Sequence, residues 1–250
     1  MAASKPVVGI FGLTGCAGDQ LVLLNCEDQL LDVARVLDVR DFLMASSASD
    51  AACELDIALV EGAVVSRRDQ ERLLRIRMRS KTLVAVGTCA VWGGVAAMGD
   101  GVDRAAMAFD VYGDLGTMYD MSPARALKQV VKVDVNLTGC PVEKEQLLSA
   151  ITHFVNGDPP LYPAYPVCAE CRIRENNCLL IEHGEVCCGP LTAAGCNARC
   201  PALSVPCVGC RGPASDFNAV SALAMFAEKG IPREAVAMKL RTFAPAAFVE

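Results

Sequence analysis

The sequence predicts an α/β protein with a doubly wound parallel sheet, followed by a small irregular cysteine-rich domain. Two observations carry this prediction. Short β-branched runs alternate with helical patterns over the first ~155 residues, which is typical of a parallel sheet with helices on both faces. Beyond this point the alternation stops, and nine cysteines fall between residues 168 and 210. We therefore expect one domain over residues 1–157 and a second over residues 158–250.

Five strands are expected in the first domain. The runs lie at residues 7–13, near the end of 33–39, and at 56–62, 82–88 and 130–137. Apolar spacing predicts helices over residues 20–35, 72–79 (with Ser66 as the N-cap) and 142–155. Sheets of this kind bind ligands just beyond the carboxyl ends of their strands, so candidate site residues are sought there.

The second domain has a different sequence pattern, without alternating strands and helices. Residues 158–166 are dense in proline and predict a connector rather than a helix or strand. Residues 214–229 predict one C-terminal helix, with Ser215 as a possible cap and residues 230–232 as its stop.

Composition excludes several classes of protein. The 250 residues are 53% hydrophobic and 21% charged, with a net charge of −6 and a mean hydropathy of +0.34. That is too apolar for a disordered chain and too acidic for a nucleic-acid or anionic-membrane partner. No run of about 20 apolar residues predicts a membrane span.

The N-terminus bears on the compartment. The segment L-T-G-C at 13–16 looks like a lipoprotein cleavage box, but the apolar run before it is short and only one lysine precedes it. We therefore expect a cytoplasmic protein, in which 14 cysteines are metal ligands or catalytic groups rather than disulfides.

Three cysteines of the first domain share a context. Cys16, Cys89 and Cys140 each follow an expected strand in a Gly/Thr turn, and Asp19 follows Cys16 in the spacing C-x-x-D. Because such turns open on one edge of the sheet, these four residues could converge as ligands of one [4Fe–4S] cluster. The alternative is that the cysteines are small buried side chains. Glu61 ends the third strand at the same edge. Its possible roles are a ligand, a proton carrier and a hydrogen-bond partner for the loops.

Eight cysteines of the second domain form a nearly palindromic run with C-x2-C at each end. They are Cys168, Cys171, Cys178, Cys187, Cys196, Cys200, Cys207 and Cys210. Eight thiolates match two cubane clusters. Two zinc sites of four thiolates each fit the same count, and disulfides are a further alternative. Cys26, Cys53 and Cys188 are left over, and Cys188 could exchange roles with its neighbour Cys187.

These motifs together resemble the small subunit of cytoplasmic group 3 [NiFe]-hydrogenases. The segments that carry the resemblance are G-L-T-G-C-A-G-D-Q-L (12–21), V-E-G-A (60–63), G-T-C-A (87–90), T-G-C-P (138–141), Y-P-V-C-A-E-C (165–171), residues 187–201 and V-G-C-R-G-P (208–213). The resemblance implies a flavodoxin-like domain that holds a proximal cluster, and a cysteine-rich domain that holds a medial and a distal cluster.

Carried over by position, the resemblance implies three sets of ligands. The proximal set is Cys16, Cys89 and Cys140, with Asp19 at the position of the family's fourth cysteine. Cys168, Cys171, Cys178 and Cys187 would hold the distal cluster, and Cys196, Cys200, Cys207 and Cys210 the medial one. A carboxylate is a harder ligand than a thiolate, so the proximal cluster would differ from that of relatives with four cysteines. Deazaflavin-reducing relatives also have an aspartate there; whether Asp19, Glu61 or an external group is the fourth ligand stays open.

The function implied is electron transfer in an oxidoreductase complex, with three [4Fe–4S] clusters and no catalytic residue on this chain. The partners implied are a large subunit with the nickel–iron site and an acceptor subunit that binds a flavin or nucleotide, with NAD(P), deazaflavin or ferredoxin as acceptor. No G-x-G-x-x-G or P-loop motif is present in this sequence, so nucleotide chemistry would belong to a partner. Two alternatives are an iron–sulfur subunit of a complex I-like assembly and a structural zinc protein.

Overall fold

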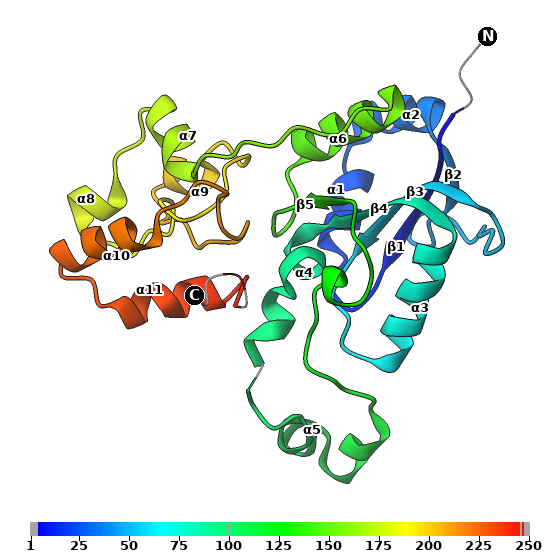
Figure 1. Ribbon diagram of the computed structural model, residues 1–250, viewed down its shortest axis with the longest axis horizontal. Coiled ribbons are helices and arrows are strands. Elements are labelled where there is room, and N and C mark those ends of the chain that lie inside the picture. The colour runs from blue at the N-terminus through cyan, green and yellow to red at the C-terminus, as the bar shows by residue number, and fades with distance from the viewer. Residues whose placement is uncertain (1–4, 100, 246, 248–250) are drawn as a thin grey trace.

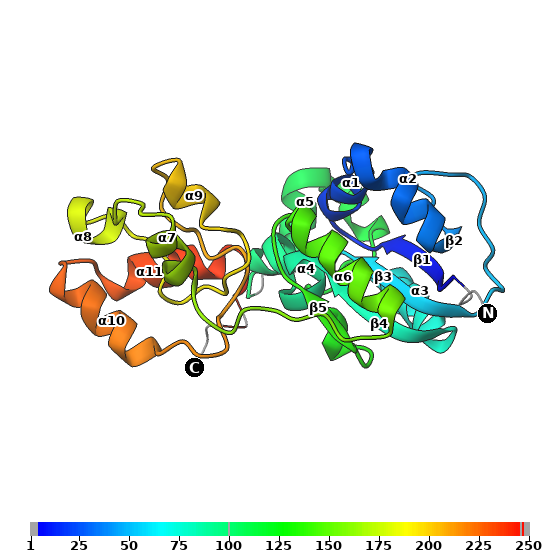
Figure 2. The ribbon, with the colours of Figure 1, turned by 90° about the horizontal axis from the view of Figure 1, so that it is seen from above.

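The computed structural model describes residues 5–99, 101–245 and 247. Figure 1 shows two lobes, and Figure 2 shows them side by side from above. We call residues 5–157 the α/β region and residues 158–245 the cysteine-rich region. The chain passes from one to the other between helices α6 (Lys144–Asn156) and α7 (Val167–Ile173).

The α/β region is built on one parallel sheet of five strands. These are β1 (Val7–Gly12), β2 (Asp38–Asp41), β3 (Leu55–Glu61), β4 (Ser80–Val86) and β5 (Val135–Leu137). Their order across the sheet is β2-β1-β3-β4-β5, and all pairs are parallel. This is the flavodoxin-like order, and it confirms the predicted fold class.

Alternate side chains of the central strands enter two apolar clusters, one on each face of the sheet. On β3, Ile57 and Leu59 belong to the cluster that contains side chains of α1 (Gly18–Leu24), α2 (Glu27–Val36) and α6. Ala58 and Val60 belong to the other cluster, with side chains of α3 (Arg67–Met78). The predicted Ser66 cap is present, since its Oγ accepts a hydrogen bond from the Asp69 amide at 3.1 Å.

Several predicted bounds are wrong. The strand predicted near the end of residues 33–39 is present as β2, which begins at Asp38, whereas residues 33–36 belong to helix α2. The helix predicted over 20–35 is two helices, separated at Asn25 and Cys26. Residues 87 and 88 begin helix α4 (Gly87–Trp92) instead of ending a strand. Of the strand predicted over 130–137, residues 130–134 lie outside the sheet. Val130, Val131 and Val133 pack against the apolar cluster that contains side chains of α3.

An extension that the sequence did not predict follows α4. It comprises the 3-10 helices η1 (Gly94–Gly99) and η2 (Gly113–Met118) and, between them, helix α5 (Arg104–Tyr112). Helix α5 lies at the far end of this extension in Figure 1. Its large apolar side chains and those of η2 are mostly exposed, Val111 and Met118 among them.

The cysteine-rich region contains short helices and loops. The helices are α7, α8 (Leu179–His183), α9 (Arg199–Ala202), α10 (Ala219–Glu228) and α11 (Arg233–Arg241). The predicted C-terminal helix begins later than expected: Asn218 caps α10, whereas the Ser215 hydroxyl donates to the Ala164 carbonyl. Pro232 is the N-cap of α11, a helix that the sequence did not predict.

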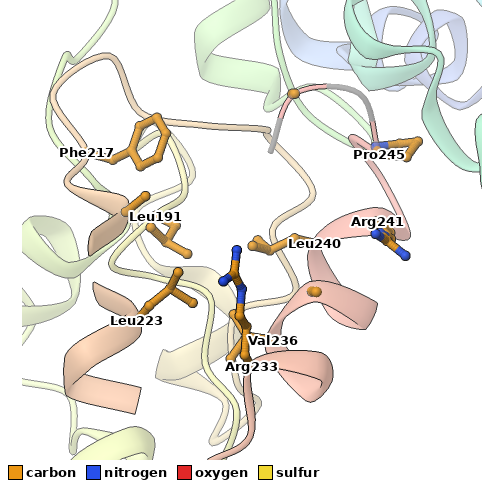
Figure 3. A pocket seen from close by; sticks show the side chains of 11 residues that line it. Leu191, Phe217, Leu223, Arg233, Val236, Leu240, Arg241 and Pro245 are labelled. Carbon is orange, nitrogen blue, oxygen red and sulfur yellow. The ribbon is translucent and has the colours of Figure 1, made fainter. Parts of the chain in front are cut away.

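Helices α10 and α11 enclose a cavity of about 610 Å³, shown in Figure 3. Leu191, Phe217 and Leu240 contribute apolar walls, and Arg233 and Arg241 lie among the lining residues. None of the described residues that line this cavity is a cysteine. Over the described ranges, the structure has no helix of the length and apolarity that a membrane crossing needs.

Candidate metal centres

The structure brings Cys16, Cys89 and Cys140 together at the carboxyl edge of the sheet. Cys16 follows β1, Cys89 lies in the first turn of α4 after β4, and Cys140 follows β5. Burial raises the pKa of the Cys140 thiol to about 12, and the neighbouring Cys89 and Cys16 contribute to this shift. Cys16 is exposed, whereas the other two are partly buried. We call these residues with Asp19 the first set.

Asp19 lies within this set in a buried position. Its Oδ1 accepts a hydrogen bond from the Val142 amide at 2.7 Å. Burial raises its pKa to about 7, the Val142 hydrogen bond opposes the shift, and nearby Glu61 adds to it. Gly87 has a φ of +81°, and a Cβ there would lie 1.8 Å from Asp19 Oδ2. Only glycine allows the strand end to approach the carboxylate so closely.

Glu61 is buried beside the first set, but its carboxylate is occupied by the start of α1. Its oxygens accept hydrogen bonds from the Asp19 amide at 3.3 Å, the Gln20 amide at 3.3 Å and the Gln20 side chain at 2.8 Å. Of the three roles open from the sequence, these contacts favour the hydrogen-bond partner that holds the loop after β1.

A second set of cysteines comes from α7, α8 and the segment after α8. Cys168 and Cys171 lie one turn apart on α7, Cys178 is the N-cap of α8, and Cys187 follows α8. Burial raises the pKa of Cys168 to about 12, with further contributions from Cys187, Cys171 and Cys178. The thiols of Cys171, Cys178 and Cys187 thus lie around that of Cys168.

A third set, Cys196, Cys200, Cys207 and Cys210, lines a cavity of about 280 Å³ between the two regions. Cys140 of the first set lines the same cavity. Burial raises the pKa of Cys210 to about 11, with Cys196 as the next contributor. Four thiols thus line one space at the junction of the lobes.

Short contacts connect the sets. A main-chain hydrogen bond from Cys140 reaches the Cys210 thiol, and the Thr88 hydroxyl donates to the Cys210 carbonyl. On the other side of the third set, the Cys207 amide donates to the Cys187 sulfur at 3.3 Å. The third set therefore lies between the first and the second, although it comes last along the chain.

The remaining cysteines lie outside the sets. Cys188 is fully buried among the apolar side chains of the cysteine-rich region, whereas its neighbour Cys187 belongs to the second set. Cys26 is also fully buried, and its thiol donates to the Val22 carbonyl at 3.2 Å. Every one of the 14 cysteines, all of them within the described ranges, is free of a disulfide.

Sequence reasoning missed one buried charge beside the third set. Arg211 lines the same cavity and is only 2% exposed. In the sequence, Arg211 directly follows Cys210 in a Gly/Pro-rich turn. A charged residue in such a turn is ordinarily a solvated one, so the sequence alone did not indicate burial.

The donor sets fit a metal–sulfur group. Thiolate is a soft ligand that selects zinc, Cu(I) and iron–sulfur clusters, and four thiols in each of two sets match the four ligands of a cubane or of a zinc ion. Among the described residues, no three His, Cys, Asp or Glu side chains are grouped as the ligands of a single metal ion.

Comparison with known proteins places the chain in a family. Residues 16–154 match the family described as NADH ubiquinone oxidoreductase, 20 Kd subunit. The chain is 38% identical to sulfhydrogenase 2 subunit delta of Pyrococcus furiosus over 95% of this chain and 98% of that protein. It is 30% identical to a subunit of the vhu F420-non-reducing hydrogenase of Methanocaldococcus jannaschii, over 82% of this chain and 81% of the relative.

Solved structures agree with this placement. A chain of an NAD+-reducing [NiFe]-hydrogenase in the H2-reduced state superposes with a TM-score of 0.59 at 25% identity, covering 64% of this chain and 96% of that one. A chain of the [NiFeSe] hydrogenase from Desulfovibrio vulgaris Hildenborough has the same fold over 88% of this chain and 97% of its own length, with a TM-score of 0.58 at 17% identity. The protein thus belongs to the family of the 20 kDa NADH ubiquinone oxidoreductase subunit, and within it to the group 3 hydrogenase small subunits, which serve electron transfer.

Proposed function

We propose that this chain relays electrons through three [4Fe–4S] clusters, between the nickel–iron site of a large subunit and an acceptor subunit. The observation that carries the proposal is the cavity between the lobes, lined by the four thiols of the third set and by Cys140 of the first. Such a relay needs its carriers close together, and the contacts from Cys140 to Cys210 and from Cys207 to Cys187 support that arrangement.

The contacts also support an order for the relay. The first set (Cys16, Asp19, Cys89, Cys140) would hold the proximal cluster, the third (Cys196, Cys200, Cys207, Cys210) the medial cluster and the second (Cys168, Cys171, Cys178, Cys187) the distal cluster. When bound, a [4Fe–4S] cluster supplies reversible one-electron transfer at a potential set by charge, hydrogen bonds and exposure. The chain's own residues contribute the thiolates, the main-chain amides that donate to them, and the burial that excludes water.

For the fourth proximal ligand we propose Asp19 rather than Glu61. The carboxylate of Glu61 already accepts three hydrogen bonds from Asp19 and Gln20. The carboxylate of Asp19 accepts one from the Val142 amide, and its charge acts on the thiols of both Cys89 and Cys140. The matched variants Asp19→Asn and Glu61→Gln distinguish the two: we expect the first to change one cluster's EPR signal and midpoint potential, and the second to leave the iron content intact.

The exposed Cys16 indicates where electrons would enter or leave. A buried nickel site on a partner could come near the first set only at this edge, so we place the large subunit against it. The relatives' names include a sulfhydrogenase, an F420-non-reducing hydrogenase and an NAD-reducing hydrogenase. These names do not share one acceptor, so we keep NAD(P) through a flavin, a deazaflavin and ferredoxin as alternatives. We place the complex in the cytoplasm, where thiols stay reduced.

Metal analysis of the purified complex tests the proposal. With this chain's contribution separated from that of the partner subunits, we expect about twelve iron atoms per chain and no stoichiometric zinc. Reductive titration followed by low-temperature EPR should then resolve three centres. Two zinc ions and no iron would instead establish the structural zinc protein.

A further inference from the structure

Arg211 occupies an unusual place for a cation. It directly follows Cys210, its residue is 2% exposed, and it lines the same cavity as the third set of cysteines. Lysine and arginine are almost never buried this fully unless a partner compensates the charge. Some group close to Arg211 should therefore carry a compensating negative charge.

The hydrogen bonds of Arg211 leave part of its guanidinium group without a partner. Its Nε donates to the Ala193 carbonyl at 3.1 Å and the Ala194 carbonyl at 3.0 Å. Its Nη1 is buried, and no residue in the described ranges accepts a hydrogen bond from it. Carbonyl oxygens carry no net charge, so the cation remains to be compensated, and burying an uncompensated charge is costly.

Two carboxylates near Arg211 already have other partners: Glu143, which lines the same cavity, pairs with Arg199, and Glu170 accepts hydrogen bonds from the Gly195 and Ala198 amides. The thiols of the third set are the remaining candidates for the compensating anion. A Cβ at Gly195, where φ is +114°, would lie 2.6 Å from Nη2, so the guanidinium group lies directly against the main chain that leads into Cys196. Arg211 is joined directly to Cys210 in the chain, and Cys196, Cys210 and Arg211 line the same cavity.

We propose that Arg211 is the buried counter-ion of the cluster held by Cys196, Cys200, Cys207 and Cys210, and that it raises the reduction potential of that cluster. The inference rests on the proposed function, since it presupposes a cluster in the third set. Reduction adds one electron from a neighbouring centre of the relay, and the guanidinium group stays protonated throughout. A fixed positive charge favours the more negative, reduced state, so Arg211 is a residue that adjusts potential and does not itself react.

The test is a redox titration of the purified complex, followed by EPR, with Arg211→Gln. We expect the equilibrium constant for reduction of one cluster to fall at least tenfold, which lowers its midpoint potential by about 59 mV or more for a one-electron couple. The midpoint potentials of the other two clusters should stay constant. Arg211→Lys keeps the charge and should retain most of the wild-type potential. The matched control is Arg174→Gln, because Arg174 also donates to a main-chain carbonyl of the same loop, that of Asn197, but is exposed.

Each outcome supports or overturns the role of the charge. Unchanged potentials in Arg211→Gln with full iron content would overturn the proposal, as would a fall of equal size in Arg174→Gln. If Arg211→Gln loses about a third of the iron, retention of that iron in Arg211→Lys supports a requirement for the charge, whereas loss in both variants overturns it in favour of a packing role. If the wild-type complex holds no iron, the proposed function itself fails, and this result is distinguishable from all of these.

Discussion

The two lobes of this chain are stabilised in different ways. In the α/β region, five paired strands separate two apolar clusters, and side chains such as Leu83, Val84 and Leu55 are fully buried. In the described part of the cysteine-rich region, the helices are 4 to 10 residues long. Its apolar cluster includes Cys188 and Cys207, with further cysteines packed against it. Helices so short are not stable by themselves.

The difference indicates where folding energy comes from in each lobe. The α/β region buries enough apolar surface to fold as a sheet protein does. In the cysteine-rich region, part of the interior is formed by the thiols that we propose as cluster ligands, so we expect the binding free energy of the metal group to contribute to folding. The experiments below compare the two regions, from the largest expected effect to the smallest.

Removal of iron should separate the two regions most clearly. With a strong chelator under reducing conditions, we expect amide hydrogen exchange to become fast over residues 165–213, while strands β1, β3 and β4 keep most of their protection. The measurement is hydrogen exchange followed by mass spectrometry, with the untreated complex as the control. Equal loss of protection in both regions would contradict the comparison.

Truncation of the two cores should have different consequences. Leu83→Ala removes a fully buried side chain from β4, and we expect it to lower the free energy of unfolding by about 2–5 kcal/mol without changing the iron content. Phe226→Ala removes a fully buried side chain from α10 and should also reduce bound iron. Urea unfolding and iron analysis of both variants check this, with the exposed Leu203→Ala as the control.

The adjacent cysteines 187 and 188 allow a finer comparison within one region. Cys187 belongs to the second set, whereas Cys188 lies in the apolar core. The Cys187→Ala variant should therefore lose about four iron atoms and one EPR signal. Cys188→Ala should keep the iron and cost about 1 kcal/mol of stability. Reversal of the two iron contents would exchange the roles of these residues.

The smallest effect is expected at an acidic residue of the α/β region. Burial alone would raise the pKa of Asp134, but hydrogen bonds from the Leu83 amide, Arg77 and Lys132 outweigh it, so its pKa is lowered. The stabilisation is therefore present above the unfolded pKa of about 3.9 and is lost as pH falls through the folded value. Asp134→Asn should cost about 1 kcal/mol at pH 7 and weaken the acid dependence of urea unfolding. A variant with an unchanged acid profile would show that Asp134 makes no such contribution.

The predictability of each feature follows from how local its cause is. The strands at 7–13 and 56–62 were predictable because apolar β-branched runs are a local signal. Helix α11 was not, because Pro232 equally suits the stop of one helix and the start of another. The cysteine turns could be found from their Gly/Thr context, whereas the burial of Arg211 and the loop-holding role of Glu61 depend on contacts with segments distant in sequence.

One side chain of the α/β region has a consequence for the mechanics of the whole molecule. The Thr88 hydroxyl accepts a hydrogen bond from the Gly139 amide at 3.3 Å and donates to the Cys210 carbonyl. A single oxygen thereby joins the turns that carry Cys89, Cys140 and Cys210. A displacement of any one of these turns therefore acts on the other two through the same hydroxyl group.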